Sequence, residues 1–346
     1  MSGFDDASAT RRRVLALLGA TVGGAALLSG TPARAAAAEL RIGFQKSSVN
    51  LMVARERKLV EAHLAGTPLK WVEFPAGPQL LEALAVDGVD FGFTGDTPPV
   101  FAQAAAKDIW YVGLEPPKPA NSALLVPRDS ALRTLADLKG KRVGLQKGSS
   151  AHYLVVRAVA AAGLRWSDIT PVYLAPSDGR AAFERGALDA WGIWDPYYAA
   201  AEIDGQARVL STGQGLSSNN SFYLASRALT GRPNVVDALL GAISEADAWV
   251  HANQAQTATL LSTASGLPLS ATLRFIERRS AGPVRHLSPA DIADQQRVAD
   301  AFANLELIPK PLRVAEVVWR PVGPQSAEGA GGLAPERPSA AAARRI

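Results

Sequence analysis

The sequence of 346 residues contains no cysteine. Disulfide bonds, thiolate metal sites and a lipid anchor on an N-terminal cysteine are therefore excluded. Methionine is almost as scarce, because the chain has 2 methionines, Met1 and Met52. Such sparing use of sulfur fits a protein made when sulfur is short, and equally a genome that uses few sulfur-containing residues.

A strong excess of one charge is also lacking. The chain has 36 basic and 32 acidic residues, and residues 1–35 contribute Arg11, Arg12, Arg13 and Arg34 to the first count. A nucleic-acid partner, which would need a clustered basic face, is not expected. The length suits two domains rather than one.

Enzyme signatures are missing as well. The sequence has no GxSxG elbow, no HExxH helix and no GxxxxGK[ST] phosphate loop. The 4 histidines, His63, His152, His251 and His286, lack metal-ligand spacing. We therefore expect no cofactor and no enzymatic activity, and any ATP-driven step belongs to another chain.

The longest apolar run near the N-terminus is short. Thr10–Leu15, with its three arginines, opens the run Val14–Leu28, which ends before Ala33-Arg34-Ala35. A membrane span needs roughly 20 apolar residues. Residues 1–35 are therefore predicted to be a twin-arginine signal peptide, which implies a soluble periplasmic protein.

An internal repeat organises the rest of the chain. Arg41–Ser48 reappears as Arg142–Ser150 with one inserted glycine, and Gly88–Pro98 matches Gly186–Pro196 loosely. Two segments that recur in the same order at nearly the same spacing predict two similar lobes.

Short apolar runs in both copies are typical of buried parallel strands. The expected strands are Leu40–Gln45, Leu69–Phe74, Val89–Thr94, Trp110–Leu114, Val143–Gln146, Val172–Ala175 and Asp189–Ile193. Helical spacing predicts Leu80–Val86, Ala151–Ala162, Val235–Asn253, Thr257–Thr263, Ala271–Arg279 and Pro289–Leu305. The fold class is α/β, and we expect the C-terminal helices to return to the first lobe.

The predicted domain boundaries follow from this pattern. Lobe 1 would comprise residues 39–124 and 225–320, and lobe 2 residues 125–224. Two linking stretches, Ser122–Pro127 and Ser221–Ser226, would form a two-stranded hinge. Residues 321–346, rich in Pro, Gly, Ala and Arg, are predicted to be a disordered tail.

Ligands of open α/β sheets bind beyond the carboxyl ends of the strands. There, Ser149 or Ser150 could cap a helix, and Gly148 would let backbone amides approach an anion. Thr94-Gly95-Asp96 ends another predicted strand. An ordinary helix cap without a ligand is the alternative interpretation of each segment taken alone.

Four large aromatic residues cluster in the second copy. Trp191, Trp194, Tyr197 and Tyr198 lie within eight positions, and strand alternation puts Trp191 and Trp194 on different faces. They cannot all belong to the core. Rings at the rim of a cleft would hold the apolar part of an organic anion.

Several motifs resemble the aliphatic sulfonate-binding proteins of ABC transporters. They are Trp71–Gln79, Thr94–Asp96, Glu115–Pro117, Gln146–Ser150 and Trp191–Tyr198. The likeness runs from about Leu40 to Arg320. It implies a type II periplasmic binding fold whose lobes close on a sulfonate.

The resemblance and the motifs together give the candidate ligand-binding residues. These are Gln45, Thr94, Gly95, Asp96, Glu115, Gln146, Gly148, Ser149, Ser150, His152, Trp191, Trp194, Asp195 and Tyr223. The first turn, Lys46-Ser47-Ser48, departs from the family, whose members tend to place glycine just after the Gln-Lys pair.

The expected function is therefore capture of organic alkanesulfonates as a sulfur source, by a monomer that delivers them to a membrane permease with a separate ATPase subunit. Alternatives are binding of a related anion such as taurine, a sulfate ester or nitrate, and a sensor subunit with the same cleft. An enzyme of pyrimidine-precursor synthesis on this fold is a further alternative, against which the leader counts.

Overall fold

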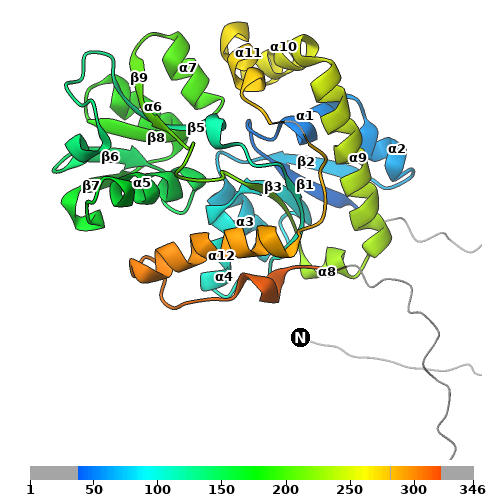
Figure 1. Ribbon diagram of the computed structural model, residues 1–346. Coiled ribbons are helices and arrows are strands. Elements are labelled where there is room, and N and C mark those ends of the chain that lie inside the picture. The colour runs from blue at the N-terminus through cyan, green and yellow to red at the C-terminus, as the bar shows by residue number, and fades with distance from the viewer. Residues whose placement is uncertain (1–37, 281, 321–346) are drawn as a thin grey trace, which may run out of the picture. The chain divides into compact units, whose positions relative to one another are not determined.

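The computed structural model describes residues 38–280 and 282–320, which form two five-stranded sheets with helices on their faces (Figure 1). The predicted leader (1–35) and tail (321–346) lie outside the described residues. Among the helices described, none has the length and hydrophobicity of a transmembrane span.

The first sheet has the strand order β2-β1-β3-β10-β4. Its strands are β1 (Leu40–Phe44), β2 (Leu69–Glu73), β3 (Phe91–Gly95), β4 (Trp110–Glu115) and β10 (Ser221–Ala225). β1 pairs in parallel with β2 and β3, whereas β10 runs antiparallel between β3 and β4. We call this sheet and the helices packed on it the first lobe.

The second sheet repeats this arrangement in the order β7-β6-β8-β5-β9. Its strands are β5 (Ser122–Pro127), β6 (Arg142–Leu145), β7 (Thr170–Tyr173), β8 (Ala190–Trp194) and β9 (Ala207–Thr212). Here β5 is the antiparallel strand, between β8 and β9. We call this sheet and its helices the second lobe.

The repeat seen in the sequence is thus a repeat of topology, and the predicted α/β fold with two similar lobes is confirmed. The same ion pair recurs in each copy: Arg41 Nη2 lies 2.6 Å from Asp90 Oδ1, and Arg142 Nη2 lies 3.3 Å from Asp189 Oδ1. In both copies the backbone N–H of the arginine also donates to the aspartate. All the expected strands form, with ends that differ by at most two residues.

The predicted linking stretches are wrong in position. Ser122–Pro127 and Ser221–Ala225 are the antiparallel strands β5 and β10, each inside a sheet. The chain passes between the sheets earlier, through residues 116–121 and 213–220. Apolar runs such as Ala123–Val126 are fully buried. Such burial is typical of a strand inside a sheet rather than of a connection between lobes.

Twelve helices are described. They are α1 (Val49–Glu56), α2 (Leu59–His63), α3 (Gly77–Ala85), α4 (Thr97–Ala104), α5 (Ser150–Ala161), α6 (Pro176–Glu184), α7 (Tyr197–Ile203), α8 (Arg227–Thr230), α9 (Pro233–Ala252), α10 (Gln254–Ser265), α11 (Leu269–Glu277) and α12 (Pro289–Asn304). α9 packs on α1 and α2, and α12 packs on α4, so these helices return to the first lobe as expected. α11 differs, because it also packs on α7 of the second lobe.

Buried apolar side chains join the lobes on one side. Tyr153 and Val156 of α5 share a cluster with Val298 and Phe302 of α12. In Figure 1 this contact and the contact of α7 with α11 lie on opposite sides of the space between the sheets. The strand ends of both sheets face that space.

Candidate functional site

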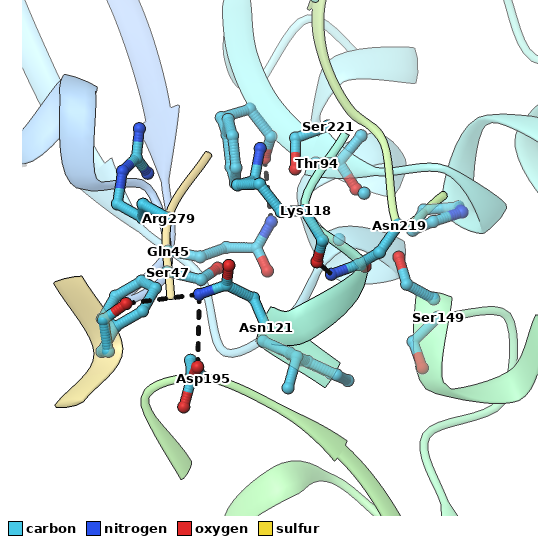
Figure 2. A pocket seen from close by; sticks show the side chains of 17 residues that line it. Gln45, Ser47, Thr94, Lys118, Asn121, Ser149, Asp195, Asn219, Ser221 and Arg279 are labelled. Atoms are coloured by element: carbon cyan, nitrogen blue, oxygen red, sulfur yellow. Dashed lines mark hydrogen bonds between the residues drawn. The ribbon is translucent and has the colours of Figure 1, made fainter. Parts of the chain in front are cut away.

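A pocket lies between the lobes, lined by side chains from both (Figure 2). Its lining residues are Gln45, Ser47, Gly77, Phe93, Thr94, Gly95, Pro98, Lys118, Asn121, Ser149, Ser150, Trp194, Asp195, Asn219, Ser221, Phe275 and Arg279. Its volume is about 50 Å³. At roughly 10–15 Å³ for each water molecule, that space suits a small head group.

Strand ends and helix starts supply most of the lining. Gln45 follows β1, Thr94 and Gly95 end β3, and Ser149 precedes α5. The first N–H groups of a helix have no partner within the helix, and the helix dipole favours an anion there. The structure thus brings together seven of the predicted residues: Gln45, Thr94, Gly95, Ser149, Ser150, Trp194 and Asp195.

Gly95 marks the point at which the lobes touch. A Cβ atom on Gly95 would lie 2.0 Å from Oγ of Ser150, at the start of α5 in the other lobe. No real Cβ tolerates such a distance. Glycine at this position therefore permits the lobes to close on the pocket.

Gly148 has a role different from the predicted one. Its φ of +71° requires glycine, but its N–H donates to Nδ1 of His152 at 3.2 Å and does not face the pocket. His152 is buried among Phe101, Trp166 and Phe302. Burial, and then Lys147, lower the pKa of His152 to about 3, so the ring is neutral and accepts this bond.

Two lining residues carry buried donor groups that are not used. Among the described residues, Oγ1 of Thr94 and the Nε and Nη1 atoms of Arg279 find no hydrogen-bond partner. The side chain of Arg279 is only 3% exposed. Buried donors without partners are costly, so these groups indicate a ligand that accepts hydrogen bonds.

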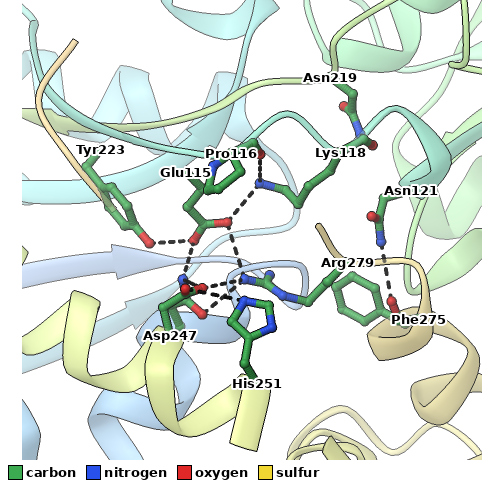
Figure 3. Close-up of polar contacts among 11 residues, drawn as sticks. Glu115, Pro116, Lys118, Asn121, Asn219, Tyr223, Asp247, His251, Phe275 and Arg279 are labelled. Atoms are coloured by element: carbon green, nitrogen blue, oxygen red, sulfur yellow. Dashed lines mark hydrogen bonds and ion pairs between the residues drawn. The ribbon is translucent and has the colours of Figure 1, made fainter. Parts of the chain in front are cut away.

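A network of buried charges lies beneath the pocket (Figure 3). Lys118 Nζ donates to Oε2 of Glu115 at 2.8 Å, and Tyr223 donates to its Oε1 at 2.5 Å. Arg279 Nη2 lies 3.3 Å from Oδ1 of Asp247 and 3.1 Å from Oδ1 of Asn50. The network fixes two cations at the pocket wall.

The pKa of Glu115 reflects that network. Burial alone would raise it, but the positive charges of Lys118 and Arg279 outweigh burial and lower the pKa of Glu115 to about 2. Glu115 therefore stays ionised. It does not line the pocket, and holds Lys118 in place from below.

Asp195 is the one carboxylate among the lining residues, and its oxygens are already engaged. Oδ1 accepts from the backbone N–H of Ala199 at 2.9 Å and from Arg278 Nη1 at 3.1 Å, and Oδ2 accepts from Asn121 Nδ2 at 3.2 Å. Burial raises the pKa of Asp195 to about 7, against the opposing effect of Arg278. Within the described part of the chain, the lining thus presents unused donors on Thr94 and Arg279 and one unused acceptor, Oδ1 of Asn121, while its one carboxylate is already engaged.

Of the four clustered aromatic residues, only Trp194 lines the pocket. Trp191 is 1% exposed and packs with Phe183 in the core of the second lobe, so it lies outside the predicted binding surface. The ring of Tyr198 is also buried and carries the guanidinium of Arg278 at 3.7 Å. Trp194 lines the pocket and Trp191 lies in the core because the two side chains point to opposite sides of the sheet at β8.

The other predicted residues surround the pocket without lining it. Asp96 is buried at the start of α4, where Thr97 donates to it at 2.8 Å. Burial, opposed by Thr97 and Ser150, raises the pKa of Asp96 to about 6. Gln146 accepts from Ser149 through its carbonyl oxygen, and Tyr223 lies between Phe91 and Phe93.

Sequence reasoning missed several lining residues. They are Ser47, Gly77, Phe93, Pro98, Lys118, Asn121, Asn219, Ser221, Phe275 and Arg279. Lys118 directly follows the Glu115–Pro117 motif and Gly77 lies in the Trp71–Gln79 motif, so a sequence motif points to each of them as a candidate. Arg279 had none, because α11 brings it to the pocket only through tertiary packing.

The arrangement can bind a compact anion by neutral donors, helix starts and two fixed cations. Within the described residues, no group of three or more His, Cys, Asp or Glu side chains could hold a metal ion.

Comparison with known proteins agrees with this geometry. Residues 33–264 match the NMT1-like family. The alkanesulfonate-binding protein SsuA of Xanthomonas axonopodis pv. citri, solved with MOPS bound, is 47% identical with a TM-score of 0.79; the match covers 82% of this chain and 98% of that one. The periplasmic aliphatic sulphonate binding protein SsuA of Escherichia coli is 44% identical with a TM-score of 0.76, covering 81% and 97%.

A more distant relative is named for taurine. The taurine-binding periplasmic protein of Escherichia coli (strain K12) is 29% identical over 249 residues, which are 66% of this chain and 76% of that protein.

Proposed function

This chain belongs to the NMT1-like family, and from that premise we propose that it is a solute-binding protein that captures alkanesulfonates for uptake through an ABC transporter. The likeness to two alkanesulfonate-binding proteins over nearly their whole length supports the proposal. The protein would act in the periplasm as a monomer and deliver its ligand to a permease with a separate ATPase subunit.

The observation that carries the proposal is the set of unused donors at the pocket. Thr94 Oγ1 and two nitrogens of Arg279 are buried without partners among the described residues, and Lys118 adds a second fixed cation. The only carboxylate of the lining, Asp195, is already paired with Arg278. A ligand that accepts several hydrogen bonds and carries one negative charge satisfies these groups.

A sulfonate head group has these properties. It is ionised at any physiological pH, offers three acceptor oxygens and has no proton to donate. A phosphonate near neutral pH carries more charge and can keep a proton that needs an acceptor. The alkyl tail would lie along Trp194, whose indole ring gives apolar contact without demanding a particular tail.

Calorimetry with a matched pair of ligands tests the proposal. We expect 1-propanesulfonate to bind the purified protein at least about tenfold more tightly than 1-propylphosphonate, a difference of about 1.4 kcal/mol. The two ligands share one tail, so the comparison isolates the head group. Absence of sulfonate binding, or equal affinity for the two ligands, would contradict the proposal.

The same titration decides between the related anions. Taurine, a sulfate ester and nitrate serve as competitors, and tighter binding of any of them than of every alkanesulfonate would reassign the ligand. Chemical conversion of any ligand by the purified protein in the calorimeter cell would instead favour an enzyme on this fold.

A further inference from the structure

Two consecutive arginines directly after α11 reach in opposite directions. Arg279 turns to the first lobe, where Nη2 donates to Asn50 at 3.1 Å and pairs with Asp247 at 3.3 Å. Arg278 turns to the second lobe, where Nη1 donates to Asp195 Oδ1 at 3.1 Å. The end of α11 is therefore tied to both lobes within two residues.

Arg278 is held by more than one group of the second lobe. Its guanidinium lies 3.7 Å from the ring centroid of Tyr198, and Nη2 pairs with Glu202. The side chain of Arg278 is 12% exposed and that of Asp195 is fully buried. A stacked and doubly paired guanidinium has a defined position, because its planar fork fits these partners.

The lobes also touch elsewhere, at the packing of α4 on α5 and at the two apolar contacts described next. Ala199 and Ala200 of α7 form a small apolar cluster with Ala271 of α11. On the other side of the pocket, Tyr153 of α5 packs with Phe302 of α12. Tyr153 and Phe302 do not line the pocket, whereas the contact at Arg278 reaches the lining through Asp195 and the neighbouring Arg279.

We propose that Arg278 is a positioning residue, which holds the second lobe closed over a bound anion while Arg279 presents its unused nitrogens to that anion. The inference rests on the proposed function, since it assumes a sulfonate between the lobes. We call the contacts of Arg278 with Asp195, Tyr198 and Glu202 the clasp. A clasp that forms after the ligand has entered affects the rate of ligand dissociation. Its loss should therefore shorten the lifetime of the complex and leave the rate of association nearly unchanged.

Stopped-flow kinetics with 1-propanesulfonate and Arg278→Gln test the proposal. We expect koff to rise at least about tenfold while kon changes by less than about threefold. Arg278→Lys should restore part of the lifetime, because it keeps the charge but loses the fork and the stacking. Arg274→Gln is the matched control, since Arg274 also pairs with Glu202 at 3.4 Å but is 48% exposed; its koff should change less than about twofold.

Glu202→Gln removes the ion-pair partner of Arg278 and so weakens the same clasp. It provides the test if Arg278→Gln does not fold. An unchanged koff in both variants, or a fall in kon that accounts for the loss of affinity, would overturn the inference. Absence of sulfonate binding by the unaltered protein would instead contradict the proposed function. The two failures are thus distinguishable.

Discussion

Glu115 is the residue on which both cations of the pocket depend. It accepts from Lys118 and lies 3.6 Å from Arg279, and the three side chains are almost completely buried. Breaking a buried ion pair by removing one partner typically costs about 3–5 kcal/mol, because the remaining charge has no compensation. The carboxylate is thus more important for stability than a surface ion pair would be.

The substitution Glu115→Gln should lower the free energy of unfolding at pH 7 by about 3–5 kcal/mol, measured by urea denaturation. The pKa of Glu115 is lowered from 4.5 to about 2 in the folded protein, so its contribution is present above pH 4.5 and is lost as the pH falls through about 2. The difference between the unaltered protein and the variant should therefore shrink over that range.

Glu184→Gln is the control for this prediction. Glu184 pairs with Arg180 at 2.7 Å but is 42% exposed, and we expect its loss to cost less than about 1 kcal/mol. A Glu115→Gln variant as stable as the control, or a difference that grows toward low pH, would contradict the account of the network.

At the scale of elements, the starts of α4 and α5 meet across the pocket at Gly95 and Ser150. The Cβ that alanine adds to Gly95 would lie 2.0 Å from Ser150 Oγ and 3.3 Å from Ser150 Cβ. The first distance is impossible, and overpacking of this kind costs about 1–3 kcal/mol. Because the clash lies between the two lobes, we expect this free-energy cost to oppose their closure rather than the folding of either lobe.

Gly95→Ala should therefore weaken 1-propanesulfonate about tenfold, and the contraction seen by small-angle scattering on adding ligand should diminish. Combining it with Ser150→Ala removes the clashing hydroxyl and should restore part of the contraction. Gly231→Ala is the control, because its nearest contact beyond neighbouring atoms is an ordinary 3.5 Å. Full contraction of Gly95→Ala at saturation would count against a closing contact here.

Local sequence patterns predicted the elements that depend on neighbours in the chain. The turn from β6 to α5 could be predicted, because a strand, a glycine and two serines in succession define it without distant help. The same patterns do not distinguish strands β5 and β10 from links, because a short apolar run looks the same whether it crosses between lobes or enters a sheet.

At the scale of the whole molecule, the repeat predicted two similar lobes and a site between them. It could not predict Arg279, which contacts Asn50 across 229 positions of sequence, nor Asn121, which joins Asp195 to the carbonyl of Phe275. Those positions depend on how α11 packs between the lobes. Trp191 illustrates the same limit, since alternation separates the faces of β8 but does not say which face is covered.

The central claim is that a sulfonate lies between the lobes, with its head at the starts of α4 and α5. A crystal structure with 1-propanesulfonate tests it most directly. We predict sulfonate oxygens within about 3.2 Å of Thr94 Oγ1 and Ser150 Oγ, and the propyl chain against Trp194. A sulfonate bound outside this pocket, or one whose head points to solvent while its tail fills the pocket, would contradict the account.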